Sequence, residues 1–190
     1  MNRHPLYRIP LAIALCAAPA VPALAQKVLP AQSEIAFVTK QMGVPVDGKF
    51  KKFDAQITLD PKKPEAGTVS FTIDTGSAAF GAPETDAEVP KPAWLNVAKF
   101  PQASFQSTAI KGLGTGKFEV AGKLTIKGNT HDVLVPVVVT QAGANSSAAG
   151  SFTIKRLEFK VGEGEWADTS MVANDIVVKF KLALTGLGPL

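Results

Sequence analysis

The stretch FEVAGKLTI over residues 118–126 shows the pattern that decides the fold. Its apolar side chains, among them Phe118, Val120 and Leu124, alternate with polar or small ones. Successive side chains of a β-strand point to opposite faces, so a period of two puts one face in an apolar interior and the other in water. The tripeptide KGN at 127–129 follows at once and predicts a tight hairpin into the next strand. The stretch therefore predicts an antiparallel sheet with one wetted face.

The same alternation recurs along the chain, interrupted by loops rich in Gly, Pro and Asn. It predicts strands over residues 33–41, 47–59, 67–75, 103–111, 117–126, 130–141, 149–160 and 174–187. About eight antiparallel strands with short links favour a barrel or a sandwich. The long segment 47–59 favours the barrel, because such a strand must bend around a curved sheet. The Phe50 to Phe53 spacing breaks its alternation and predicts a bulge near Lys51-Lys52.

Only residues 76–102 lack the period of two, and they include Pro83, Pro90, Pro92 and Pro101. We expect a long connection here that folds over one end of the barrel, with a short helical turn around residues 93–96. A loop of this length in a compact domain is usually functional or disordered.

The N-terminus has the three parts of a secretory signal: a basic start with Arg3 and Arg8, an apolar run over 9–21, and small residues at 23–25. Residues 1–25 are therefore predicted to be a signal peptide, and residues 26–190 one domain. The apolar run is shorter than the roughly 20 residues that cross a bilayer, so we expect no integral membrane span after processing. Cys16, the one cysteine of the chain, would leave with the signal, together with all thiol chemistry.

Signatures of catalysis are missing from the predicted mature chain. His131 is its one histidine, so no second histidine or cysteine completes a zinc or iron site. No Gly-x-Ser-x-Gly elbow and no glycine-rich phosphate loop occurs. Glu84, Asp86 and Glu88 could form a hydrolase-like group, but carboxylates on a loop are usually only solvated. We expect no enzyme, no metal and no cofactor, and without a basic cluster interleaved with aromatics we expect no nucleic acid.

The aromatic residues favour a water-soluble barrel with an apolar inside over an outer-membrane one. A membrane barrel needs girdles of Tyr and Trp at both interfaces. The one tyrosine, Tyr7, lies in the predicted signal, and Trp94 and Trp166 are too few for girdles.

The inside of an eight-stranded barrel is wide enough either to be filled by side chains or to hold one small ligand. Inward small residues such as Ala55 and Gly122 leave room, which favours the ligand, although a packed core stays an alternative. The apolar faces of the predicted strands nominate a set of lumen residues: Phe37, Phe71, Ile73, Phe105, Phe118, Val120, Val178 and Phe180.

Several segments resemble the YceI-like family. They are SEIAF at 33–37, KQMGVPVDGKF at 40–50, FDAQI at 53–57, KFPQASF at 99–105, GKLTIKG at 122–128, RLEF at 156–159 and GEGEW at 162–166. Their order and spacing carry the resemblance over the whole mature chain. It implies a periplasmic polyisoprenoid-binding protein with an eight-stranded, antiparallel, all-β lipocalin-like barrel. One position departs from the family pattern: Lys160 stands where the family commonly has a glycine.

The resemblance also implies the ligand class, an isoprenoid such as a quinone or polyprenyl phosphate, or a similar long-chain lipid, held for transport or storage. The tail would lie in the lumen and the head group at the mouth, where Lys40, Trp94 and Arg156 are candidate contacts by charge, stacking or position. Each of the three has a structural role as its alternative. The alternative function is a barrel without ligand that acts in structure or interaction, for example with a membrane redox protein, and a homodimer stays open.

Overall fold

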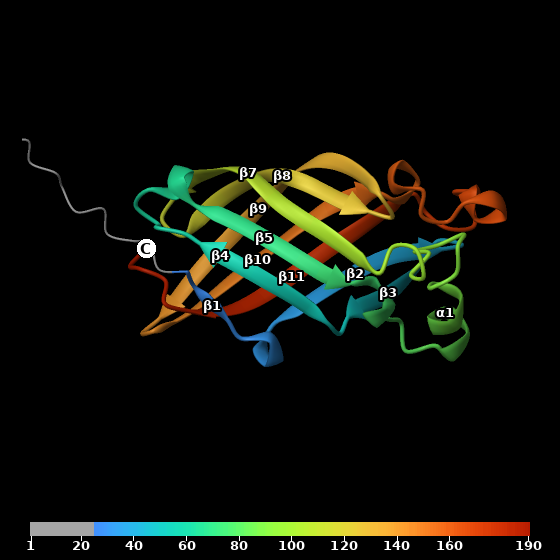
Figure 1. The fold of residues 1–190 in the computed structure, drawn as a ribbon, viewed down its shortest axis with the longest axis horizontal. Coiled ribbons are helices and arrows are strands. Elements are labelled where there is room, and N and C mark those ends of the chain that lie inside the picture. The colour runs from blue at the N-terminus through green and yellow to red at the C-terminus, as the bar shows by residue number, and fades with distance from the viewer. Residues whose placement is uncertain (1–24) are drawn as a thin grey trace, which may run out of the picture.

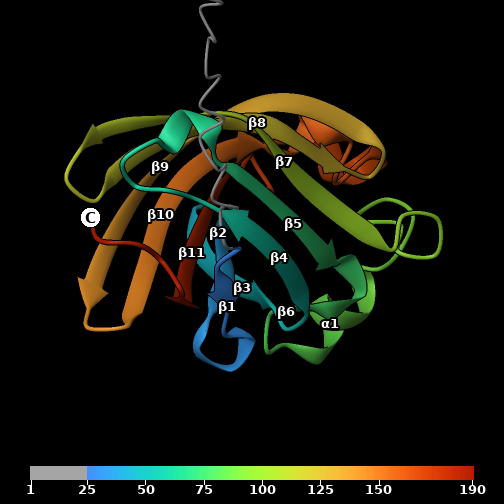
Figure 2. The ribbon, with the colours of Figure 1, turned by 60° about the vertical axis from the view of Figure 1, so that its left-hand side comes forward.

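The computed structural model describes residues 25–190. One antiparallel sheet, curled into a barrel, makes up most of the molecule (Figures 1 and 2). The predicted signal peptide, with Cys16 and Tyr7, lies outside the described residues except for Ala25. The predicted all-β antiparallel barrel is confirmed, but the described residues form eleven strands where eight were predicted.

The strands follow the alternation seen in the sequence. They are β1 (Lys27–Val28), β2 (Glu34–Gln41), β3 (Val44–Phe50), β4 (Phe53–Thr58), β5 (Thr68–Asp74), β6 (Ala78–Ala79), β7 (Gln102–Gly114), β8 (Lys117–Ile126), β9 (Asn129–Ala142), β10 (Asn145–Lys155) and β11 (Asp175–Thr185). The sheet order is β4-β5-β7-β8-β9-β10-β11-β2-β3-β6, with β1 paired to β11. The quoted stretch is β8, and it pairs along its whole length with β9 through the predicted hairpin.

The helical segments are short. They are η1 (Pro30–Gln32), η2 (Pro64–Ala66), η3 (Thr75–Ser77), α1 (Pro83–Glu88), η4 (Arg156–Phe159) and η5 (Gly164–Ala167). Helix α1 begins with a proline and has Glu84 and Asp86 in its first turn, both of which favour a helix start. It lies in the predicted long connection, at one end of the barrel (Figure 1). The predicted turn at 93–96 forms hydrogen-bonded turns, with the Trp94 N–H donating to the Lys91 carbonyl at 3.0 Å.

The predicted strand 47–59 is wrong as one continuous strand with a bulge. The chain breaks at Lys51-Lys52 into β3, which pairs with β2, and β4, which pairs with β5. Because of the break, Phe50 belongs to β3 and Phe53 to β4, so each residue keeps the alternation of its own strand although their spacing breaks a period of two. This change of partner brings the two ends of the sheet together, because β4 begins the strand order and β3 lies next to its other end.

Two very short strands complete the closure, and the alternation did not predict either. The Gln26 N–H donates to the Ile57 carbonyl of β4 at 2.8 Å, while β1 pairs with Leu184 and Thr185 of β11. At the other seam, β6 pairs with Lys49 and Phe50 of β3. Strands of two residues are too short for a period of two to appear in the sequence.

The predicted strand 149–160 is also too long at its C-terminal end. Strand β10 stops at Lys155, and Arg156–Phe159 turns into η4. Lys160 then ends this turn with φ 56° and ψ 33°, in the left-handed region. The glycine that the family commonly has at this position would adopt that conformation without strain, so the bend is kept here with a lysine.

Candidate functional site

A cavity of about 520 Å³ lies inside the barrel. Side chains from β2, β3, β4, β5, β7, β8, β9, β10 and β11 line it, nearly all of them apolar. The interior is therefore not filled by side chains, which disfavours the packed core that the sequence left open.

All eight residues predicted for the lumen line this cavity: Phe37, Phe71, Ile73, Phe105, Phe118, Val120, Val178 and Phe180. Side chains of a strand point alternately to its two faces, and each of these residues stands at a position that faces the inside of the barrel. That they contact a ligand stays a prediction.

Three of these phenylalanines lie over glycines of the same sheet. The ring of Phe37 covers Gly48 on β3, that of Phe105 covers Gly122 on β8, and that of Phe180 covers Gly150 on β10. A Cβ added at any of the three glycines would meet ring carbons at 2.4–2.5 Å. The expectation that Gly122 leaves room in the lumen is therefore wrong, because the ring of Phe105 occupies that space.

The two ends of the cavity differ in polarity. Toward the C-terminal end of β11, the lining is apolar and includes Leu59, Val139, Leu184 and Leu187. The opposite end, beside α1, contains the polar lining residues Thr39, Gln41, Glu84, Thr85, Glu88, Trp94, Arg156 and Trp166. An amphiphile in this cavity would have its tail at the apolar end and its head at the polar end.

Residues 156–174, between β10 and β11, cross the polar end and are called the cap segment below. Arg156 organises it and is only 1% exposed. The guanidinium donates to five backbone carbonyls: Nε to Ala173 (3.0 Å), Nη1 to Val161 (2.9 Å) and Gly162 (3.0 Å), and Nη2 to Trp166 (2.7 Å) and Val172 (2.8 Å). An arginine has five N–H donors, so this set uses all of them. Burial lowers the pKa of Arg156.

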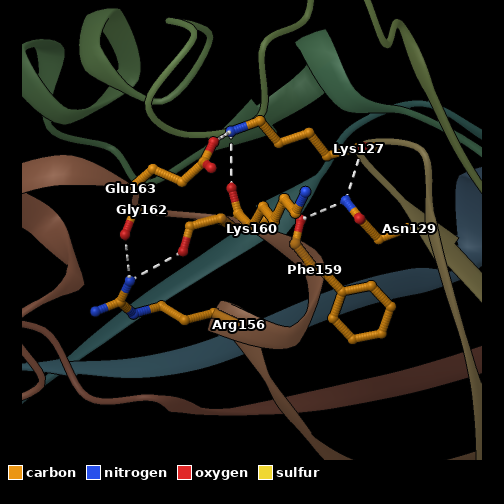
Figure 3. A network of polar contacts seen from close by, with 8 residues as sticks. Lys127, Asn129, Arg156, Phe159, Lys160, Gly162 and Glu163 are labelled. Carbon is orange, nitrogen blue, oxygen red and sulfur yellow. Dashed lines mark hydrogen bonds and ion pairs between the residues drawn. The ribbon is translucent and has the colours of Figure 1, made fainter.

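A second buried cation ties the cap segment to the barrel (Figure 3). Lys127, in the turn between β8 and β9, has a side chain only 5% exposed, and its Nζ donates to the Lys160 carbonyl and to Glu163 Oε2, both at 2.7 Å. The hydrogen bond from Lys127 is the main cause that lowers the pKa of Glu163. Asn129 Nδ2 adds a bond to the Phe159 carbonyl at 3.2 Å.

The three residues predicted for the mouth lie in different settings. Trp94 lines the cavity, with its ring 5.4 Å from that of Trp166 and 5.9 Å from the Arg156 guanidinium carbon. Arg156 also lines it, but a hydrogen bond from Arg156 to a head group would have to replace a carbonyl partner. Lys40 is exposed and outside the lining, and its carbonyl accepts from the Ala173 N–H at 2.8 Å.

Sequence reasoning missed Thr39 and Gln41 as lining residues. Both continue the inward alternation of Ile35 and Phe37 on β2, so the signal was present. Neither was nominated for the lumen, because only apolar residues were chosen from the inward faces.

His131, Asp86 and Glu88 each have a partner within the fold. His131 Nε2 lies 3.0 Å from the Glu158 carbonyl and its ring packs on Phe159. Asp86 Oδ1 accepts from the Phe80 N–H at 2.6 Å, and Glu88 pairs with Lys91. Within residues 25–190, no group of three His, Cys, Asp or Glu side chains could hold a metal ion. No helix in the same range is long and apolar enough to cross a membrane.

Comparison with known proteins agrees with this architecture. A family model described as a YceI-like domain matches residues 27–184. The crystal structure of BcnA from Burkholderia cenocepacia is 44% identical and superposes with a TM-score of 0.80, covering 83% of this chain and 99% of that one.

Two further relatives are more distant or shorter in overlap. A UPF0312 protein of Yersinia pestis (strain Pestoides F) is 41% identical over 96 residues, 50% of each chain, so the match spans about half the length of that relative. The structure of a polyisoprenoid-binding domain from Saccharophagus degradans, implicated in plant cell wall breakdown, has a TM-score of 0.68 at 15% identity and covers 85% of this chain and 98% of that one. At that identity, the likeness shows the fold.

Proposed function

This chain belongs to the YceI-like family, and from that premise we propose that it is a non-enzymatic lipid-binding protein of the periplasm. It holds the tail of an isoprenoid, such as a quinone or a polyprenyl phosphate, or of a similar long-chain amphiphile, and either carries or stores it. The similarity to the polyisoprenoid-binding domain from Saccharophagus degradans supports the ligand class, and the predicted signal peptide supports the compartment.

The observation that carries the proposal is the apolar cavity of about 520 Å³ inside the barrel. Cavities lined by apolar side chains stay dry and take up apolar molecules. Transfer of each methylene from water into such a space contributes about 0.8 kcal/mol, so a long tail binds without specific polar contacts. The cavity therefore discriminates among ligands by the length and width of their apolar tails.

The backbone accounts for how the barrel can keep this space. Ladder hydrogen bonds join the strands from β4 through β3. The segment 26–28 connects β4 to β11 through the Gln26–Ile57 bridge and β1, and β6 pairs with the outer edge of β3. These hydrogen bonds connect the strands around the cavity through the backbone alone, without the side chains that line it.

Extraction of the natural ligand tests the proposal. The full chain, expressed with its N-terminal segment in a Gram-negative host, is purified from the periplasmic fraction and extracted with organic solvent for mass spectrometry. We expect an isoprenoid, quinone or fatty-acyl species in near-stoichiometric amount. Recovery of no lipid would overturn the proposed lipid binding. Recovery of the protein only from the cytoplasm would overturn the proposed periplasmic location.

Variants of the lining link the extracted lipid to the cavity. Phe71→Asp and Phe118→Asp put a carboxylate against the tail, and folded protein carrying either change should retain much less lipid. Lys111→Asp is the matched control, because Lys111 is exposed on β7. Equal lipid in all three variants would show that the lipid lies elsewhere.

A further inference from the structure

Lysines gather on the outside of the barrel, over the neighbouring strands β11, β2 and β3 and the segments that border them (Figure 1). All of them are exposed, and they are called the lysine band below: Lys27, Lys49, Lys51, Lys52, Lys179 and Lys181. Those on strands occupy outward positions, because the residues on either side of them in the sequence point into the barrel or are more buried.

The pairing register places two of these lysines on either side of one small residue. Lys179 of β11 and Lys49 of β3 both pair with Ala36 of β2, so no carboxylate stands between them. Lys181 pairs with Glu34, but its amino group is not within ion-pair distance of that carboxylate. Within residues 25–190, no amino group of the lysine band has a carboxylate within 4.0 Å.

Lysines on another part of the wall are placed differently. On the outer face of β7 to β9, Lys123 Nζ lies 2.9 Å from Asp132 Oδ1, and Lys111 pairs in register with Glu119. Lysines there are balanced by neighbouring acids. The six lysines of the band have only three acids within it or at its borders, Glu34, Asp47 and Asp54. The face over β11, β2 and β3 therefore keeps a net positive charge.

A groove of about 440 Å³ lies within the band, where the chain passes from β3 to β4. Its lining combines three lysines with one acid, one hydroxyl and three apolar residues: Lys49, Lys51, Lys52, Glu34, Ser33, Pro30, Phe50 and Phe53. The backbone is held in place here, because the N–H groups of Lys51 and Lys52 donate to the carbonyl and the hydroxyl of Ser77 at 3.1 and 3.0 Å. The groove thus offers positive charge beside apolar surface.

The residue types of the band favour a membrane over a protein as its partner. Protein interfaces are enriched in Arg and depleted in Lys, and the planar guanidinium suits paired hydrogen bonds to a carboxylate. Arg156, the one arginine among residues 25–190, is buried. Flexible ammonium groups spread over several strands suit the diffuse charge of anionic lipids instead, and each lysine near such a surface strengthens binding about fivefold.

We propose that the lysine band docks the barrel on a membrane of anionic phospholipids, with a phosphate head group in the groove. Phe50 lines both the groove and the cavity, so the docked face lies against the cavity wall. Docking goes beyond the proposed function and does not depend on it, because the charges of the band attract an anionic surface whether or not the cavity holds a lipid.

Co-sedimentation of the purified protein with vesicles tests docking. We expect the protein to pellet with phosphatidylglycerol vesicles, to stay in the supernatant with phosphatidylcholine vesicles, and to be released by salt, which screens exposed charges. Uptake of lipid into the cavity leaves an undocked protein in the supernatant, so this readout is separate from lipid binding. Equal pelleting with the two lipids would refute the proposal. Failure to pellet with phosphatidylglycerol would refute it too, and would make an acidic protein the better partner.

Matched triple variants test whether the band itself is responsible. Lys49→Gln, Lys179→Gln and Lys181→Gln together remove three charges from the band, and we expect them to weaken binding to phosphatidylglycerol vesicles about a hundredfold at low salt. Lys111→Gln, Lys117→Gln and Lys123→Gln remove three exposed charges from β7 and β8 and should weaken it less than about fivefold. Equal losses in the two triple variants would mean that net charge, and not the band, governs the binding.

A fluorescent label on otherwise unchanged protein reports which face meets the membrane. Ala36→Cys puts the label between Lys179 and Lys49, and Ala121→Cys puts it on the outer face of β8; both alanines are half-buried. Cys16, the one native cysteine, lies in the predicted signal peptide. With phosphatidylglycerol vesicles, the emission of an environment-sensitive dye should rise at position 36 and stay unchanged at position 121. The same response at both positions would contradict docking through the band.

Discussion

The wall of the barrel and the cap segment are built in opposite ways. In the wall, strands such as β8 and β9 are held by a continuous ladder, and their inward side chains need only be apolar. The cap segment has little regular structure, and the buried side chains of Arg156 and Lys127 bind its backbone carbonyls instead. The comparison indicates why the wall can enclose a cavity, whereas the cap segment depends on hydrogen bonds from individual side chains.

Loss of Arg156 should give the largest effect. Arg156→Met keeps an apolar stem but leaves five buried or half-buried carbonyls without their donor. Leaving such groups unpaired typically costs several kcal/mol, so we expect a loss of about 3–5 kcal/mol in the free energy of unfolding, measured with urea. The adjacent exposed Lys155→Met should change it by less than about 0.5 kcal/mol. Similar midpoints for the two variants would contradict the role assigned to Arg156.

Overpacking the wall should have the next largest effect. In Gly122→Ala the new methyl would meet the Phe105 ring at 2.4 Å and the Gln106 carbonyl at 2.7 Å. We expect a cost of about 1–3 kcal/mol, together with weaker lipid binding as the ring is displaced toward the lumen. Gly188→Ala is the control, since its methyl would have an ordinary contact of 3.8 Å. Unchanged thermal stability in Gly122→Ala would show that the glycine is not needed for that ring.

Acid should weaken the tie between Lys127 and Glu163. The pKa of Glu163 is lowered in the folded state, chiefly by the hydrogen bond from Lys127. A lowered carboxyl pKa means that the stabilisation is present above the unfolded pKa of about 4.3 and is lost as pH falls through the folded value. Parent and Glu163→Gln should therefore differ in melting temperature near neutral pH and converge toward about pH 3. A difference that stays constant with pH would exclude an ionic contribution.

The smallest effect is expected at Lys160. Its left-handed backbone, with φ 56°, costs a lysine roughly 1 kcal/mol, and a glycine avoids this cost but loses more chain entropy on folding. Lys160→Gly should thus raise the free energy of unfolding by up to about 1 kcal/mol. Lys155→Gly, in the extended strand β10, should lower it by a similar amount. A clear loss of stability in Lys160→Gly would indicate that the side chain has a contact of its own.

The sequence predicted the wall well because the wall is periodic. Alternating apolar residues placed all eight lumen residues on strands whose inward faces line the cavity. The closure of the barrel was harder to predict, because β1 and β6 are two residues long and the break at Lys51-Lys52 is a change of pairing partner rather than of pattern.

The cap segment was the least predictable part. A buried cation that binds carbonyls leaves no periodic trace, and Lys127 reads in the sequence as an ordinary turn residue. Arg156 was placed at the mouth only through the family resemblance, and its five carbonyl partners come from residues 161–173, which have no strand or long helix to signal their path. The polar end of the cavity therefore required the structure.

Affinity as a function of tail length tests the central claim most directly. Isoprenyl acetates of two to six units are titrated into delipidated protein by calorimetry. If the cavity takes up the tail, the free energy of binding should become more favourable with every unit, by up to about 0.8 kcal/mol per buried carbon, until the cavity is full and the affinity levels off. Binding that is absent, or that does not depend on tail length, would contradict the account.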